Sequence, residues 1–317
     1  MIPIFKPEFG EKEIFAIEQV MDSGMIVCGD KVRKFEEKFA EYVGCNYAVG
    51  VNSCTSALFL AFLSLGYNYR VGIPSVTFVS VINMALKAQL NIKFEDLIFV
   101  GSAYKIDNTN IYDCAHDIYR GQFKNTYINS NIQFNQTIMC YSFYPTKNLA
   151  SIEGGMICVN DKGLYNWFLK MRMHGMIRNG YDWDYSIDHP GWKFAMNEIQ
   201  AAVGLVQLEE LDSMLEKRKN CVDLYNSILG LDNKSLHLYP VIIENRDKLM
   251  EVLKNNEIGY SVHFKPCHLQ LAFKNVNKDR NMDKSEHWGE HELSLPLYPS
   301  LKPEEIEKIC KIVKNYL

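Results

Sequence analysis

The stretch that decides the predicted fold class is Tyr141-Ser142-Phe143-Tyr144-Pro145-Thr146-Lys147-Asn148-Leu149-Ala150-Ser151-Ile152-Glu153-Gly154-Gly155-Met156. It connects two apolar runs, Thr137–Phe143 and Met156–Val159, which are typical of buried strands. A lysine in the turn between such strands is either a solvated surface cation or an amine held in an apolar site. In the second case its pKa is lowered and it is ready to form a Schiff base. The turn by itself leaves both interpretations of Lys147 open.

Polar residues also follow two other predicted strands. The strand Tyr47–Val51 precedes Asn52-Ser53-Cys54-Thr55-Ser56 and then an apolar helix from Ala57 to Leu65. Small residues at a helix start leave backbone N–H groups free for an anion, although most such residues simply cap the helix. Another strand ends at Asp113, and a carboxylate that leaves a buried strand must be paired. Asp113 is therefore either a helix cap or the partner of a cationic group.

Composition excludes several classes of protein. A formal net charge of −4 gives no electrostatic reason to expect nucleic acid or an anionic membrane as partner. The apolar run Ala57–Leu65 is too short to cross a bilayer, and the N-terminal residues lack a signal-peptide pattern. The nine cysteines are scattered without a Cys-x-x-Cys pair, and His263 and His268 are poorly spaced for a metal. We therefore expect a cytoplasmic protein with reduced thiols and no metal site.

Taken together, the segments resemble the DegT family of sugar aminotransferases, which use pyridoxal 5'-phosphate (PLP) and have PLP fold type I. Ser142–Asn148 followed by Glu153–Met156 resembles the segment of the family that carries the cofactor lysine. Asn52–Ser56 resembles the family's Asn-Ser-Gly-Thr-Ala/Ser segment, with Cys54 in place of the glycine. Further matches are Pro74–Val79, Asp113–Asp117 and Gly191–Ala202.

The resemblance implies a role for each matching residue. The expected catalytic residues are Lys147, which would hold PLP as an internal aldimine, and Asp113, which would pair with the pyridine nitrogen. The other implied cofactor contacts are Cys54, Thr55 and Ser142 at the phosphate, Phe78 stacked on the ring, and His116 at the ring face or its phenolic oxygen. Lys193 is implied to reach the cofactor phosphate of a partner subunit, although a lysine before a helix is often only a surface residue.

The resemblance further implies the reaction: transfer of an amino group, with glutamate as donor, to a nucleotide-linked keto sugar, in a homodimer with shared active sites. Two alternatives remain. One is a different PLP chemistry on a sugar, such as dehydration, and relatives of that type lack the lysine that Lys147 matches. The other is a non-catalytic relative that binds the cofactor for regulation.

The predicted architecture is α/β: a mostly parallel sheet with helices on both faces in a large PLP-binding domain, residues 1–225, and a small C-terminal α/β domain, residues 226–317. The resemblance fails between Leu97 and Tyr112, where the family has a further helix–strand–helix passage. We expect the chain to lack that βα unit and to retain about six strands. Either the neighbouring strands close up or Ile98–Ala103 fills the slot, and the wall beside Asp113 is thinner, so that the cofactor is held more weakly.

Overall fold

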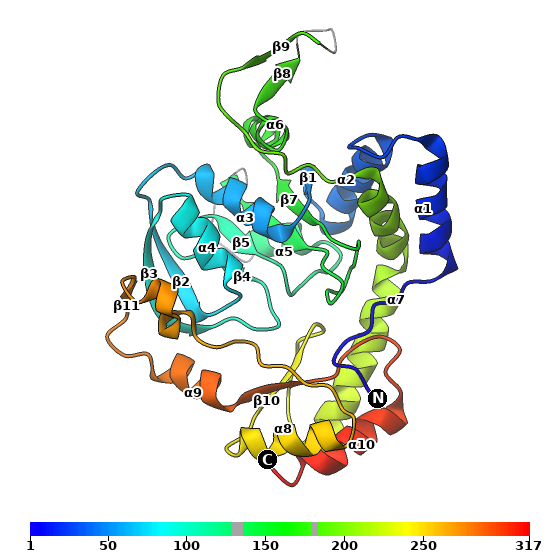
Figure 1. The fold of residues 1–317 in the computed structure, drawn as a ribbon, viewed down its shortest axis with the longest axis vertical. Helices are drawn as coiled ribbons and strands as arrows, with labels where there is room; N and C mark the ends of the chain where they lie inside the picture. The colour runs from blue at the N-terminus through cyan, green and yellow to red at the C-terminus, as the bar shows by residue number, and fades with distance from the viewer. Residues whose placement is uncertain (129–135, 179–182) are drawn as a thin grey trace.

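The computed structural model describes residues 1–128, 136–178 and 183–317, and Figure 1 shows how they are arranged. The helices are α1 (Glu11–Ser23), α2 (Asp30–Val43), α3 (Cys54–Leu63), α4 (Ser80–Lys87), α5 (Gln122–Ile128), α6 (Lys162–Met171), α7 (Glu198–Leu229), α8 (Arg246–Asn255), α9 (Asp283–His291) and α10 (Pro303–Val313). The strands are β1 (Tyr47–Val51), β2 (Arg70–Val76), β3 (Asn91–Ile98), β4 (Tyr104–Lys105), β5 (Ile111–Asp113), β6 (Ile138–Ser142), β7 (Gly155–Val159), β8 (Met176–Arg178), β9 (Tyr185–Ile187), β10 (Tyr239–Ile242), β11 (Asn277–Lys278) and β12 (Glu292–Leu295).

The central sheet has two parts, with strand orders β1-β7-β6-β5-β4 and β2-β3-β11. Parallel pairs are β5 with β6, β2 with β3 and β3 with β11. Antiparallel pairs are β1 with β7, β6 with β7 and β4 with β5. The expected α/β class is confirmed, and the strand directions are more mixed than the mostly parallel sheet that we expected. In the described residues the two parts have five and three strands, more than the six expected, because the two-residue strands β4 and β11 join the sheet.

Helices cover both faces of the sheet because successive residues of a strand point to opposite sides. In β6, Ile138 and Cys140 belong to a core that includes residues of α3 and α4. Met139 and Tyr141, the alternate residues of the same strand, belong to a core that includes residues of α2 and α7. The turn that carries Lys147 therefore leaves a strand that is buried on both sides, which fixes its position.

The connection from β3 to β5 is short and contains no helix, as the sequence predicted. The slot of the missing βα unit is filled by Tyr104–Asp107 and not by Ile98–Ala103, because Ile98 still pairs with β2 and Gly101 turns the chain at φ +80°. β4 pairs with β5, and Asp107 N donates to Gly72 O at 3.2 Å, which joins the two parts of the sheet. A Cβ atom on Gly72 would lie 2.9 Å from Cβ of Asp107, so glycine is required for this approach.

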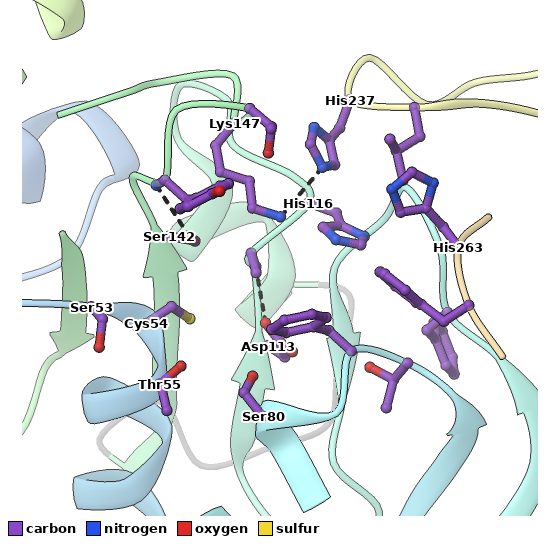
Figure 2. Close-up of a pocket in the computed structure, with 18 of the residues that line it drawn as sticks. Ser53, Cys54, Thr55, Ser80, Asp113, His116, Ser142, Lys147, His237 and His263 are labelled. Atoms are coloured by element: carbon purple, nitrogen blue, oxygen red, sulfur yellow. Dashed lines mark hydrogen bonds between the residues drawn. The ribbon is translucent and has the colours of Figure 1, made fainter. Parts of the chain in front are cut away.

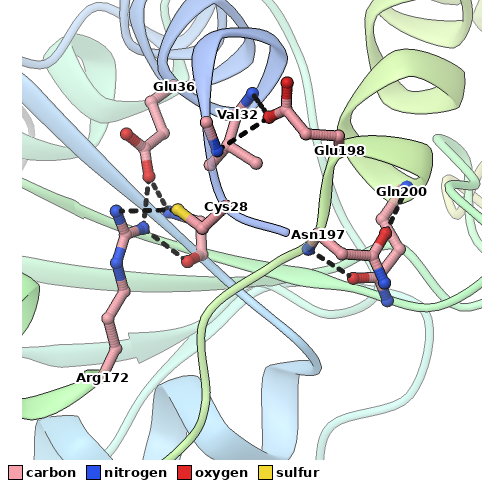
Figure 3. Close-up of polar contacts among 9 residues, drawn as sticks. Cys28, Val32, Glu36, Arg172, Asn197, Glu198 and Gln200 are labelled. Atoms are coloured by element: carbon pink, nitrogen blue, oxygen red, sulfur yellow. Dashed lines mark hydrogen bonds and ion pairs between the residues drawn. The ribbon is translucent and has the colours of Figure 1, made fainter. Parts of the chain in front are cut away.

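A buried polar network fastens the start of α7 to the N-terminal helices (Figure 3). The Glu198 carboxylate accepts hydrogen bonds from the N–H groups of Gly29, Lys31 and Val32, each at 2.9 Å. This remote carboxylate caps α2, whose first residue is Asp30, at the end where the helix dipole favours a negative charge. Nearby, Arg172 forms a buried ion pair with Glu36 and donates to Gly50 O at 2.6 Å.

The C-terminal elements have a core of their own. The end of α7, β10, α8, β12 and α10 contribute to it, and so does Ile2 from the other end of the chain. The predicted division at residue 225 falls inside the continuous helix α7, and the two-domain description stays a prediction. Within the described ranges, none of the helices combines the length and the apolar character needed to span a bilayer.

Candidate active site

A cavity of about 810 Å³ lies where the β1–α3, β2–α4 and β6–β7 connections meet the C-terminal segments. Figure 2 shows side chains from these segments pointing toward one another. The structure brings together seven of the eight predicted site residues as lining residues of this cavity: Cys54, Thr55, Phe78, Asp113, His116, Ser142 and Lys147. Lys193 is exposed and does not line it, and its amine lies 3.8 Å from Sδ of Met173.

Lys147 is held by its turn and directed into the cavity. Its N–H donates to Tyr144 O at 2.8 Å, and Phe143 N donates to Gly154 O at 3.0 Å to close the turn. The amine lies 3.3 Å from Nε2 of His237 (Figure 2). Burial lowers the pKa of Lys147 to about 8, against the opposing effect of the nearby Asp113 carboxylate. An amine with this pKa is available as a nucleophile at mildly alkaline pH.

We expect the cofactor-free protein to show this shifted titration directly. Reductive alkylation of Lys147 by a small aldehyde should increase with pH around a midpoint of about 8, because only the neutral amine reacts. The folded chain binds fewer protons than the unfolded chain between that pKa and the ordinary value of 10.5, so the free energy of unfolding should rise with pH across this window. Mass spectrometry of the Lys147 peptide measures the midpoint, with denatured protein as control. Equal midpoints in the two states would contradict the prediction.

Asp113 ends β5 and is 6% exposed. One carboxylate oxygen, Oδ1, accepts the N–H of Ala115 at 3.0 Å. Burial raises the pKa of Asp113, and the Ala115 N–H, the Lys147 amine and the nearby Tyr104 hydroxyl oppose that rise. Asp113 and Lys147 therefore place a buried carboxylate and an amine of lowered pKa in the same cavity.

The start of α3 offers an anion site at the other side of the cavity. Ser53 caps the helix by accepting the N–H of Ser56 at 3.2 Å, and Ala57 N bonds to Ser53 O at 3.1 Å. Among the described residues, no hydrogen bond uses the N–H groups of Cys54 and Thr55, which are free for a ligand. Gly155 allows this close packing, since a Cβ there would lie 2.6 Å from the backbone N of Cys54.

Two rings on this cavity have different environments. Phe78 is 52% exposed and its ring centroid lies 5.6 Å from that of Phe264, so one broad apolar surface remains open to a flat ligand. His116 is buried, and its Nδ1 accepts the N–H of Gly101 at 3.0 Å. Burial lowers the pKa of His116 well below its ordinary value, so the ring is neutral and carries its proton on Nε2.

Sequence reasoning missed two histidines of the cavity. His237 approaches Lys147 from the segment before β10, and its Nδ1 is buried with no hydrogen-bond partner among the described residues. Nδ1 of His263 lies 2.8 Å from Oγ of Ser294, and that hydroxyl donates to Oε1 of the buried Glu292 at 2.6 Å. His268, the other histidine of this segment, lies 2.6 Å from Ser75 Oγ through its Nδ1. No local pattern marks His237 or His263, because both reach the cavity through long-range packing.

Comparison with known proteins agrees with this geometry. The DegT/DnrJ/EryC1/StrS aminotransferase family matches residues 7–111 and 103–314. The spore coat polysaccharide biosynthesis protein SpsC of Bacillus subtilis is 29% identical, over 99% of this chain and 96% of that protein. The UDP-4-amino-4,6-dideoxy-N-acetyl-beta-L-altrosamine transaminase of Campylobacter jejuni is 24% identical, over 100% of this chain and 96% of that protein. The fold matches that of Helicobacter pylori PseC, an aminotransferase involved in the biosynthesis of pseudoaminic acid, with a TM-score of 0.84. The match covers 99% of this chain and 98% of that chain, at 22% sequence identity.

The same comparisons show a difference in length between this chain and a relative. The alignment with the Bacillus protein extends over 380 positions, 63 more than the 317 residues of this chain, so the relative has residues opposite gaps. The family match is divided into two segments that meet at residues 103–111. These residues lie in the connection from β3 to β5, which contains β4.

Proposed function

We propose that this chain, which belongs to the DegT/DnrJ/EryC1/StrS aminotransferase family, transfers an amino group from glutamate to a nucleotide-linked keto sugar. Membership makes it a sugar aminotransferase of a PLP-dependent family, and the proposal concerns its substrates and the roles of its residues. One observation carries the proposal most directly. The Lys147 amine, with a pKa lowered to about 8, and the buried Asp113 carboxylate line the same cavity as the open N-terminus of α3.

The residues present fit PLP, which has a phosphate, a carbonyl carbon and a basic ring nitrogen. The free N–H groups at the start of α3, with the Thr55 and Ser142 hydroxyls, would hold the phosphate. Phe78 would cover one ring face with its exposed surface. Asp113 would face the ring nitrogen with a negative charge, and Lys147 would bind the carbonyl carbon. When bound, PLP supplies an electron sink for the negative charge that develops on the reacting carbon.

The chain's own contribution to the reaction is proton transfer and charge placement. Lys147 Nζ would take a proton from the amino-bearing carbon and return it, acting as base and then as acid, for which a pKa near the working pH is suited. Asp113 would hold its negative charge beside the ring nitrogen and stabilise positive charge there. Burial lowers the pKa of His116 and of His237 well below its ordinary value, so both rings are neutral. They therefore add no positive charge that would lower the pKa of Lys147 further.

The alternatives make different predictions. A dehydrating relative would lack the lysine, whereas Lys147 is present and faces the cavity. A regulatory relative would bind PLP but would not exchange amino groups. Purified protein with PLP, glutamate and a panel of nucleotide-linked keto sugars separates these cases, with Lys147→Ala as the negative control. We expect at least one amino sugar as product, and cofactor binding without amino transfer from any donor would favour the regulatory alternative.

A shared active site leads to a complementation prediction. Lys193 is exposed and does not line its own cavity, and α1 and the following segment expose Phe15, Met25 and Val27 at 58%, 58% and 62%. We expect a homodimer in which Lys193 serves the neighbouring subunit. Lys147→Ala and Lys193→Ala chains, each inactive alone, should regain activity when mixed, because one site of the heterodimer has both lysines. Mixing Lys147→Ala with Asp113→Asn chains is the control and should restore none. An active monomer in sedimentation would contradict the prediction.

A further inference from the structure

The short connection that replaces the family's βα unit brings a tyrosine to the cavity. β4 and β5 form an antiparallel pair in which Tyr104 is directly opposite Asp113. Directly opposite side chains of an antiparallel pair lie on the same face, with Cβ atoms about 4.5–5.5 Å apart. The register therefore places the Tyr104 side chain next to the carboxylate that we assign to the cofactor ring.

Tyr104 is held rigidly in this place. It is 5% exposed, and its ring stacks on Phe99 with centroids 4.6 Å apart and planes 20° apart. Its hydroxyl lies 2.9 Å from Oγ1 of Thr77, which is also buried. All four residues, Thr77, Phe99, Tyr104 and Asp113, line the cavity. The short connection thus supplies a packed aromatic wall with one hydroxyl.

We propose that Tyr104 is a positioning residue for Asp113: Thr77 orients its hydroxyl, and the hydroxyl donates a hydrogen bond that keeps the Asp113 carboxylate ionised and directed at the cofactor ring. This inference rests on the proposed function, since it gives Asp113 the ring nitrogen as partner. It also replaces our expectation that a thinner wall beside Asp113 weakens cofactor binding, because the residues that fill the slot support the carboxylate.

The electrostatics of the cavity agree with this role. Burial raises the pKa of Asp113, and the nearby Tyr104 hydroxyl is one of the groups that lower it again. The other groups that act on this carboxylate are the Lys147 amine from the β6–β7 turn and the Ala115 N–H after β5. The Cys54 thiol at the start of α3 also faces it, and burial raises the pKa of that thiol well above its ordinary value, so it stays neutral. Without the Tyr104 hydroxyl, the balance shifts toward neutral Asp113.

The test is Tyr104→Phe, which keeps the stacked ring and removes only the hydroxyl. We expect the dissociation constant for PLP, measured by titration of cofactor-free protein, to rise by about tenfold, as for the loss of one hydrogen bond to a charged group. The acid limb of the pH–rate profile should move to higher pH, which a purely structural role would not cause. Thr77→Val, which frees the hydroxyl, should shift both quantities in the same direction.

Two comparisons make the test specific. Tyr225→Phe removes another buried tyrosine hydroxyl, which donates to Pro296 O at 3.0 Å in the C-terminal core, and should leave PLP affinity unchanged. In an Asp113→Asn background, Tyr104→Phe should change PLP affinity by less than about twofold, because the two residues act as one unit. Wild-type affinity in Tyr104→Phe, or a full tenfold effect without the Asp113 charge, would overturn this inference alone. A wild-type protein that does not bind PLP would overturn the proposed function and this inference with it.

Discussion

Lys147→Ala protein should show neither the visible absorbance of lysine-bound PLP nor measurable amino transfer. The residue has two proposed tasks, covalent binding of the cofactor and proton transfer at the reacting carbon. A positioned acid–base group alone contributes about 10²–10⁴-fold, so we expect kcat/KM to fall by about 10⁴-fold or more. The phosphate contacts at the start of α3 do not depend on Lys147, and the variant should still bind PLP without a covalent bond.

Chemical trapping identifies the lysine independently of activity. Borohydride treatment of the wild-type protein with PLP should fix the cofactor irreversibly, and peptide mapping should find it on Lys147. Lys170→Ala is a matched control, because Lys170 is a partly buried lysine that pairs with Asp188 at 2.8 Å outside the cavity. This control should keep the absorbance and the trapped peptide. Finding the reduced cofactor on any other lysine would refute the central assignment.

The residues that the sequence predicted share a local signal. Lys147, Asp113 and Cys54 each lie at the end of an apolar strand or in the connection that follows it, and in an α/β sheet the ends of neighbouring strands meet at one place. Their positions relative to the strands in the sequence therefore predicted that they lie close together in the fold. Lys193 has no such signal within one chain, and its proposed role depends on a second subunit.

The residues that sequence reasoning missed reach the cavity through contacts that no local pattern encodes. His237 and Lys147 are 90 positions apart, and they meet because the C-terminal elements pack over the cavity. Similarly, Glu198 caps α2 from 167 positions beyond Lys31. Such contacts follow from the packing of whole elements and not from the periodicity of one segment.

Tyr104 is an intermediate case. Tyr104 and Ile106 alternate with polar residues in the way that a short strand requires, whereas Ile98–Ala103 contains the turn at Gly101. Periodicity could therefore have identified the segment that fills the slot. The pairing partner and its register, which place Tyr104 opposite Asp113, depend on the space left between β5 and β2.

Asp113→Asn should leave PLP bound and slow both half-reactions by about 10²–10³-fold, comparable to the loss of one preorganised electrostatic group. Asparagine has the shape of aspartate and its oxygen can still accept the Ala115 N–H, so the loop after β5 should be preserved. What is lost is the negative charge, and a neutral amide cannot keep a positive charge on the ring nitrogen. Single-turnover rates with glutamate and with keto sugar measure the two half-reactions separately.

The pH dependence of the rate tests the role of Asp113 independently. Because burial raises the pKa of Asp113, the wild-type protein should lose activity as the pH falls through that raised value. Asp113→Asn has no carboxylate to protonate and should lack this acid limb while remaining slow at every pH. The control is Asp117→Asn, which removes a carboxylate with a pKa raised by burial to about 6 that does not line the cavity, and it should keep the wild-type rate and profile. Near-normal turnover in Asp113→Asn would mean that the ring nitrogen does not depend on this carboxylate.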